Sequence, residues 1–369
     1  MKIKNKPIIF LFIFLILIIL FVKIYFFNKV DRADINFFAF DTNVFISLYE
    51  ESTEIDYSVL LDDCKNMVDE YEYLFSRTYE DSELYKINNR ENRKIECSID
   101  TAFLFFASKK FYKETNEKFD ISVGCLVDVW SDVRENAILP TETAIKTAKE
   151  TAKNMNYNIY FLDSDGIEKN CDVIFDGIYE NIYDNYIDML NDLKNTKNYK
   201  FFIEFIGNSK YDFGAIAKGY VADQLKYELK KSNINGLINF GGNVLCIGEK
   251  PKNKKYNIGI NKPFSNGEVI GKIELVDETA VTSGVYQRYV EIDNKIYSHI
   301  IDTNTGYPID NELLSATVVC KNSIVADVLS TTLMVLGIKE SEIYVDELRV
   351  GGKDVRVYFV DDNYNYIEY

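Results

Sequence analysis

Histidine is almost absent from this chain, which has a single one, His299, among its 369 residues. A sole imidazole excludes His-rich metal sites and every mechanism that needs two histidines. It can still act as a general base near neutral pH, and a purely structural, hydrogen-bonded role is the alternative. The six cysteines are widely scattered and form no Cys-x-x-Cys pair. A structural zinc site therefore has no support, and we interpret the cysteines as small buried hydrophobic residues.

The usual nucleotide-binding and catalytic signatures are missing as well. The chain has no G-x-x-x-x-G-K-[ST] loop, no G-x-G-x-x-G turn after a strand, no G-x-S-x-G elbow and no protein-kinase motif set. Any nucleotide chemistry must therefore use another scaffold. The net charge of −16 argues against nucleic acid as a partner. An anionic ligand such as a dinucleotide would need a metal ion or local lysines to offset this charge.

One long apolar run stands near the N-terminus. Residues 8–27 are apolar except for Lys23. The length of this run reaches the roughly 20 residues that a membrane helix needs, and the lysine can extend its charged end to the membrane surface. A buried core helix is the alternative. No A-x-A-like cleavage site and no nearby cysteine follows the run, so we expect an uncleaved, non-lipidated anchor and linker over residues 1–34. Lysines before the run favour a single pass with the main domain, residues 35–369, on the extracytoplasmic side of the cell membrane.

Helices and strands follow without a regular βαβ alternation, which indicates an α+β fold. Periodicity and turn residues predict helices over 57–75, 99–116, 141–154 and 324–336, and strands over 38–49, 201–206 and 281–292. Residues 237–247 are expected to form two strands interrupted by Gly241-Gly242, and Asp293-Asn294 is expected to form a hairpin turn. Asn322 or Ser323 can cap the last helix, and Gly337 stops it. The segment at about 165–200 is rich in Asn, Asp and Tyr and has no clear period, so we interpret it as a surface insertion with one helix.

Two oxygen-bearing side chains fall on one face of the last predicted helix. Asp327 and Thr331 are four residues apart, one helical turn. Mg²⁺ prefers oxygen ligands and commonly takes only one or two carboxylates plus substrate phosphates. An aspartate that merely complements the helix dipole is the alternative.

Small residues and glycines mark two further segments. In D-F-G-A-I-A-K-G (212–219) they surround Lys218 at the start of a predicted helix. This composition lets the backbone approach a phosphate while the lysine supplies a cation; a tight turn with a solvated lysine is the alternative. N-F-G-G-N (239–243) permits a similar approach, or merely a bulge.

Eight segments together carry a resemblance to a known family. In chain order they are F-D-T-N-V (40–44), S-R-T-Y-E-D-S-E-L (76–84), K-F-D-I-S-V-G-C-L-V-D-V-W (118–130), D-F-G-A-I-A-K-G-Y-V-A-D (212–223), N-F-G-G-N (239–243), T-S-G-V-Y-Q-R-Y (282–289), H-I-I-D-T-N-T-G-Y-P (299–308) and A-D-V-L-S-T-T-L-M-V-L-G (326–337). The chain resembles the FAD:protein FMN transferase family, also called ApbE-like, over essentially everything after the apolar run.

The resemblance implies an α+β domain that binds FAD in a cleft, with Mg²⁺ on the FAD pyrophosphate. By position, Asp327, Thr331 and the main-chain carbonyl of Ala215 match the family's metal ligands. The residues that fall on the FAD site are Phe40, Lys118, Phe119, Asp120, Lys218, Ser283, His299 and Ile300. Phe40 stands where the family often has Met, and an aromatic ring there can stack on the isoalloxazine.

The reaction implied by the resemblance moves FMN from FAD to a Ser or Thr hydroxyl of a target protein and releases AMP. His299 or Asp120 can accept the hydroxyl proton, and the sequence does not choose between these two catalytic candidates. The expected partners are FAD and an acceptor protein, a membrane or extracytoplasmic redox subunit. An FAD pyrophosphatase that gives FMN and AMP, and a non-catalytic surface flavin-binding protein, are the rivals. The intact metal pair argues against pure binding, because storage needs no Lewis acid.

Overall fold

The structure of the protein is a computed structural model that describes residues 32–49, 54–152 and 155–369. The apolar run of residues 8–27 lies outside these ranges. Within them, no helix is both long enough and apolar enough to cross a membrane. The predicted domain start at residue 35 falls inside the first strand, β1 (Arg32–Ala39).

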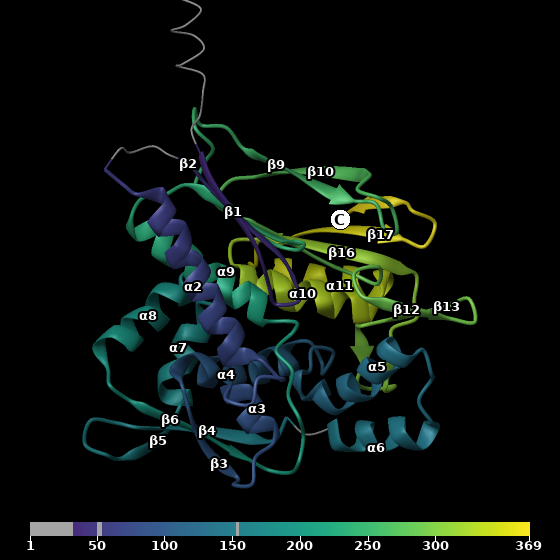
Figure 1. Cartoon of the computed structure of the whole chain (residues 1–369), viewed down its shortest axis with the longest axis horizontal. Helices are drawn as coiled ribbons and strands as arrows, with labels where there is room; N and C mark the ends of the chain where they lie inside the picture. Colours follow the sequence, from purple (N-terminus) through teal and green to yellow (C-terminus); the bar gives the residue numbers. More distant parts are fainter. Residues whose placement is uncertain (1–31, 50–53, 153–154) are drawn as a thin grey trace, which may run out of the picture.

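An eight-stranded antiparallel sheet forms the upper half of the molecule (Figure 1). Its strands, in spatial order, are β1, β2 (Thr42–Tyr49), β7 (Gly236–Phe240), β8 (Asn243–Ile247), β11 (Thr279–Gly284), β16 (Leu313–Cys320), β17 (Arg356–Asp361) and β18 (Tyr366–Glu368). The two strands predicted around Gly241 and Gly242 are confirmed as β7 and β8. The single strand predicted over 38–49 is instead a hairpin, because Phe40 and Asp41 adopt positive φ angles of 50° and 55° and reverse the chain.

Helices cover one face of this sheet and a small β-ribbon covers the other (Figure 1). The helices on the sheet are α2 (Tyr57–Phe75), α9 (Ala217–Lys231), α10 (Ser323–Leu336) and α11 (Ile338–Val350). The ribbon is β9 (Tyr256–Asn261) and β10 (Val269–Leu275), whose buried Tyr256 and Leu275 pack on Val319 and Val360 of the sheet. The central strands β11 and β16 are thus buried on both faces, and the larger core lies on the helical side.

The lower half contains a four-stranded sheet with helices of its own. The strands are β3 (Lys94–Cys97), β6 (Lys200–Phe205), β4 (Tyr157–Leu162) and β5 (Glu168–Asn170). The accompanying helices are α3 (Glu83–Asn88), α4 (Ile99–Glu114), α5 (Gly124–Asn136), α6 (Glu142–Ala152), α7 (Asp172–Glu180) and α8 (Tyr186–Thr196). The helices predicted over 57–75, 99–116 and 324–336 are confirmed, and the one predicted over 141–154 is confirmed within the described residues.

The prediction of a surface segment with one helix at about 165–200 is wrong. This segment forms β5, α7 and α8, and its aromatic side chains lie in the main core. Phe175 stacks on Phe201 with ring centroids 5.7 Å apart, and Phe103 stacks on Tyr186 at 5.7 Å. The buried Tyr186 hydroxyl donates to the Asp223 carboxylate (2.8 Å), which removes the cost of burying a polar group. Tyrosines that look polar in the sequence are therefore core residues here.

The start of α10 is capped by a residue from another helix. Asn322 occupies the cap position, but its side chain donates to the carbonyls of Ile182 and Asp184 instead. The carboxylate of Asp223, in α9, accepts hydrogen bonds from the main-chain nitrogens of Ser323 (2.8 Å) and Ile324 (2.9 Å). The predicted local cap is therefore replaced by a tertiary one. The end of α10 at Gly337, where φ is 76°, is as predicted.

Candidate active site

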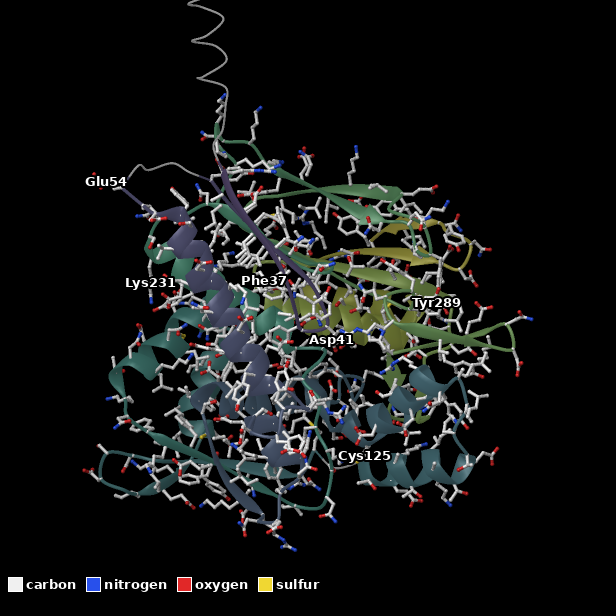
Figure 2. The ribbon with its side chains drawn as sticks, viewed as in Figure 1. Phe37, Asp41, Glu54, Cys125, Lys231 and Tyr289 are labelled. Atoms are coloured by element: carbon white, nitrogen blue, oxygen red, sulfur yellow. The ribbon has the colours of Figure 1, made fainter. Side chains whose placement is uncertain are left out.

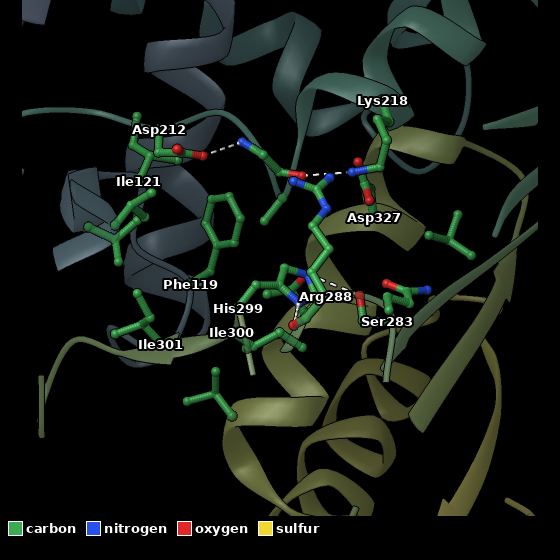
Figure 3. A pocket seen from close by; sticks show the side chains of 18 of the residues that line it. Phe119, Ile121, Asp212, Lys218, Ser283, Arg288, His299, Ile300, Ile301 and Asp327 are labelled. Atoms are coloured by element: carbon green, nitrogen blue, oxygen red, sulfur yellow. Dashed lines mark hydrogen bonds between the residues drawn. The ribbon is translucent and has the colours of Figure 1, made fainter. Parts of the chain in front are cut away.

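A cleft of about 350 Å³ lies between the central sheet and the lower layer (Figure 3). Six separate parts of the chain build its walls: the β1–β2 turn, residues 118–134, the loop before α9 with the first turn of that helix, the β7–β8 turn, the segment from β11 to residue 303, and α10. The structure brings nearly all the residues predicted for the site to this one place, where they line the cleft: Lys118, Phe119, Asp120, Ala215, Lys218, Ser283, His299, Ile300, Asp327 and Thr331.

Phe40 is the predicted site residue that does not line the cleft. Its ring packs edge to face on Phe240, with centroids 6.2 Å apart, and Phe240 does line it. Its main-chain nitrogen donates to Glu72 Oε1 (2.8 Å), which holds the hairpin tip against α2. The next residue, Asp41, reaches the cleft from this tip and lies near the middle of the molecule in Figure 2. Stacking of Phe40 on a flavin stays a prediction.

Asp327 and Thr331 present oxygen atoms to the cleft from neighbouring turns of α10. Asp327 is only 3% exposed, and its Oδ2 accepts a hydrogen bond from the main-chain nitrogen of Gly219 (2.9 Å). Burial raises the pKa of this carboxyl group, and the nearby Lys218 ammonium partly offsets the rise. Thr331 Oγ1 lies 3.2 Å from Ser283 Oγ on β11. Within the described residues no cluster of three His, Cys, Asp or Glu side chains could hold a metal.

This donor set fits a hard, partly substrate-liganded cation. One buried carboxylate, a hydroxyl and the Ala215 carbonyl supply oxygen only, which suits Mg²⁺ bound through substrate phosphates and does not suit zinc. Close packing of α9 on α10 brings the parts together. A Cβ on Gly219 would lie 2.3 Å from the Ser323 carbonyl oxygen, so only glycine permits this approach.

The loop before α9 is held in a tight turn by its own first residue. Asp212 Oδ1 accepts from the main-chain nitrogen of Gly214 (2.7 Å), and Lys218 Nζ donates to the Gly214 carbonyl (2.8 Å). The lysine therefore lies over the turn, on the side of the cleft that also holds Asp327 (Figure 3). This arrangement provides a cation and small-residue backbone for an anionic group.

Charges in the cleft are balanced, in contrast to the acidic chain as a whole. Four cationic side chains, Lys118, Arg134, Lys218 and Arg288, face four carboxylates, Asp41, Asp120, Asp212 and Asp327. Arg134 and Arg288 were not singled out from the sequence, although T-S-G-V-Y-Q-R-Y (282–289) contains the second. A diphosphate entering this cleft therefore benefits from an additional metal ion.

The two candidate bases differ in their electrostatic surroundings. Burial lowers the pKa of the His299 imidazole to about 3, and the Arg288 and Lys218 charges add to this effect. Burial raises the pKa of Asp120 to about 6, although Ser122 donates two hydrogen bonds of 2.7 Å, one from its nitrogen and one from its hydroxyl, to Asp120 Oδ1. A base with a pKa near the working pH is the more effective one, which favours Asp120. His299 is a neutral imidazole at pH 7.

Comparison with known proteins identifies the family. The model of the ApbE family matches residues 40–353. The chain belongs to the ApbE family. The match includes all eight sequence segments, and it confirms the family predicted from them.

Relatives and solved structures agree with this ApbE-family assignment. One relative is a FAD:protein FMN transferase of Klebsiella pneumoniae, 43% identical over 131 residues, which are 35% of this chain and 40% of that protein. Another, from Haemophilus influenzae, carries the same name and is 28% identical over 297 residues, 79% of this chain and 75% of that protein. The chain thus spans 40% of the first relative's length and three quarters of the second's.

The fold of this ApbE-family chain matches solved structures over almost its whole length. The ApbE protein of Thermotoga maritima superposes with a TM-score of 0.72 at 26% identity, covering 92% of this chain and 97% of that one. The flavin transferase ApbE of Vibrio cholerae gives a TM-score of 0.70 at 22% identity, with the same coverage, and shows the fold alone. The α+β fold expected from the sequence is therefore confirmed.

Proposed function

We propose that this protein transfers the FMN half of FAD to a Ser or Thr hydroxyl of an acceptor protein, with Mg²⁺, and releases AMP. The observation that carries this proposal is the buried carboxylate of Asp327, which lies with Thr331 and Lys218 in one cleft. The enzymatic activity printed in the names of the relatives supports it. A buried carboxylate beside phosphate-binding elements suits a reaction at a diphosphate better than simple flavin storage.

Asp327, Thr331 and the Ala215 carbonyl would hold the Mg²⁺. When bound, the ion screens the charge of the diphosphate and stabilises the charge that builds up on the leaving AMP. Lys218 and Arg288 are placed to bind phosphate oxygens, since both line the same cleft. Their charges and the metal together explain how a chain of net charge −16 holds an anionic substrate.

The acceptor hydroxyl needs a proton acceptor in the cleft. Its oxygen forms a bond to the FMN phosphorus while the bond from that phosphorus to the AMP oxygen breaks, and AMP leaves with the electron pair. Asp120, whose pKa is about 6, takes the hydroxyl proton. His299 is neutral and hydrogen-bonds within the cleft instead. Water in place of the hydroxyl would make the same groups an FAD pyrophosphatase.

We also propose that the run of residues 8–27 anchors the enzyme in the cell membrane with its main domain on the extracytoplasmic side. Its length and its flanking lysines support this. Such an anchor keeps the enzyme beside membrane proteins, so the acceptor we expect is a membrane or extracytoplasmic redox subunit.

The test is a transfer assay with the full chain in detergent, FAD, Mg²⁺ and a candidate redox-subunit acceptor. Flavin fluorescence that stays on the acceptor band in a denaturing gel, with the mass increment of FMN, is the expected result. An acceptor whose target Ser or Thr is changed to Ala must show no flavin fluorescence on its band. Free FMN and AMP with every acceptor tried would instead establish the hydrolase. FAD that is bound but returned unchanged would establish the binding protein.

A further inference from the structure

Arg77 lies outside the cleft, yet it joins two of the cleft's walls. It belongs to the segment S-R-T-Y-E-D-S-E-L (76–84), of which no residue lines the cleft. Its side chain is 18% exposed. Nη1 pairs with Asp212 Oδ2 (3.1 Å), and Nη2 donates to the Gly124 carbonyl (2.9 Å) and pairs with Asp128 Oδ1 (2.7 Å). One guanidinium therefore contacts the loop before α9 and the first turns of α5.

Asp212 uses both of its carboxylate oxygens for this junction. Oδ2 pairs with Arg77, while Oδ1 accepts from the main-chain nitrogen of Gly214 and so shapes the turn (2.7 Å). The next residues of this turn are Ala215, the expected carbonyl ligand, and Lys218, the expected phosphate cation. An arginine 135 positions away in the sequence thus determines the orientation of the carboxylate that shapes this turn.

The contact with α5 ties the opposite wall to the same guanidinium. Gly124 begins α5 directly after residues 118–123, of which most line the cleft. A Cβ on Gly124 would lie 2.7 Å from the main-chain carbon and oxygen of Lys210, so α5 starts in close contact with the segment that leads to Asp212. The Gly124 main-chain nitrogen donates to the Lys210 carbonyl (3.1 Å), and Lys210 Nζ pairs with Asp128 (2.8 Å).

Stability alone does not account for an arginine at this junction. Desolvating a guanidinium costs free energy, and apolar side chains often fill such a position at least as well. Its Nε is buried and has no hydrogen-bond partner in the described part of the chain, which adds to the cost. The fork geometry of arginine does, however, fix several acceptors in one plane.

We propose that Arg77 is a positioning residue which, through Asp212, holds the loop of residues 212–218 in the conformation that receives the FAD diphosphate. The identity of this ligand rests on the proposed function. The position of the loop does not, because it is a property of the protein without substrate.

The experiment compares Arg77→Met, Arg77→Lys and Asp212→Asn with the matched control Arg349→Met, all in the full chain. Arg349 is a suitable control because its guanidinium also bonds main-chain carbonyls, those of Val355 (3.1 Å) and Tyr369 (2.8 Å), and does not line the cleft. Hydrogen exchange of the amides of residues 213–219 is measured first, without FAD. We expect at least 10-fold faster exchange there in Arg77→Met and Asp212→Asn, and no local change in Arg349→Met.

FAD binding with Mg²⁺ is measured next, by flavin fluorescence. Arg77→Met should weaken binding at least 10-fold and raise the KM for FAD more than it lowers kcat, and Arg77→Lys should recover part of both effects. Unchanged exchange of the loop, or a dissociation constant within twofold of the wild type, would overturn the proposal. The proposal would also be overturned if the loss of FAD affinity merely paralleled a lower melting temperature and Arg77→Lys restored none of it. If the wild-type chain binds no FAD at all, the proposed function fails, while the exchange result still decides the role of Arg77.

Discussion

The main-chain carbonyl of Arg288 lies 3.0 Å from the main-chain nitrogen of His299 and 3.2 Å from its Nδ1. A carbonyl oxygen only accepts, so Nδ1 carries the hydrogen and Nε2 keeps its lone pair. The contact follows from the pairing of β12 (Tyr289–Ile292) with β13 (Lys295–Ser298), which places the residue before one strand beside the residue after the other. The turn between these strands, Asp293-Asn294, was predicted from the sequence, and both residues have positive φ.

The single histidine makes its protonation directly measurable. Because burial and two nearby cations lower the pKa of His299 to about 3, its imidazole NMR signals should not shift between pH 8 and pH 5. His299→Asn keeps a donor for the Arg288 carbonyl but lacks Nε2. Because Asp120 is the proposed proton acceptor, the loss of this one hydrogen-bonding nitrogen should lower kcat by only about 10-fold, and FAD affinity should change a few-fold. A titration midpoint near 6.5 would contradict this assignment.

Asp120 should determine the acidic limb of the pH profile. With its pKa raised to about 6, kcat/KM should rise with pH through about 6, and Asp120→Asn should remove this limb together with most activity. The contribution of Asp120 to the free energy of unfolding should instead decrease as pH rises. A carboxyl group whose folded pKa is raised contributes stability below its unfolded pKa of 3.8, which is lost as pH rises through 6. Chemical denaturation measures the free energy of unfolding at pH 4 and at pH 7. The decrease from pH 4 to pH 7 should be smaller for Asp120→Asn than for the wild type.

Substitution of the proposed metal ligands should lower activity without unfolding the protein. Asp327→Asn can still accept the Gly219 hydrogen bond but lacks the charge, so AMP release should fall on the order of 100-fold or more at about 1 mM Mg²⁺, with melting little changed. Thr331→Val should raise the Mg²⁺ concentration for half-maximal rate by roughly 10-fold. Thr332→Val is the neighbouring control, because the Thr332 hydroxyl donates to the Val328 carbonyl within α10 (2.8 Å). If the activity of Asp327→Asn is within a few-fold of the wild-type activity, Asp327 is not a metal ligand.

Asp223 should matter for stability more than for substrate contacts. It caps α10 with two hydrogen bonds and accepts a third from Tyr186. Asp223→Ala leaves three buried donors without partners and should lower the free energy of unfolding by about 2–4 kcal/mol. Urea denaturation measures this, with the exposed Asp132→Ala as control. Because α10 carries Asp327 and Thr331, the variant should also need more Mg²⁺; an unchanged unfolding midpoint would show that the cap is dispensable.

The proposed anchor can be tested on intact cells. Full-length protein should sediment with membranes and resist extraction by alkaline carbonate, whereas a chain starting at residue 32 should stay in the supernatant. Protease added to spheroplasts should digest the main domain. A main domain that stays protected while an extracytoplasmic marker is lost would show the opposite orientation.

Local rules explain which elements were predictable. The helix over 57–75 was predicted with its observed ends from its amphipathic period. The structure adds a local cap, because Asp56 accepts from the main-chain nitrogens of Ser58 and Val59. The Gly241-Gly242 break, the Asp293-Asn294 turn and the stop at Gly337 depend likewise on residues that tolerate positive φ. The prediction for residues 165–200 was wrong because the tyrosines and asparagines of this segment have hydrogen-bond and aromatic partners in distant parts of the chain, which no local sequence pattern reveals.

The sequence by itself determined the family, the fold class and ten of the residues that line the cleft, because motif order and residue chemistry carry this information along the chain. The tertiary structure decided what those residues do together. Only folding brings Arg77 to Asp212, 135 residues away, and Asp223 to the start of α10, 100 residues away. The lowered pKa of His299 and the raised pKa of Asp120 are likewise set by burial and by neighbouring charges. Such contacts depend on distance in space, which spacing along a chain does not encode.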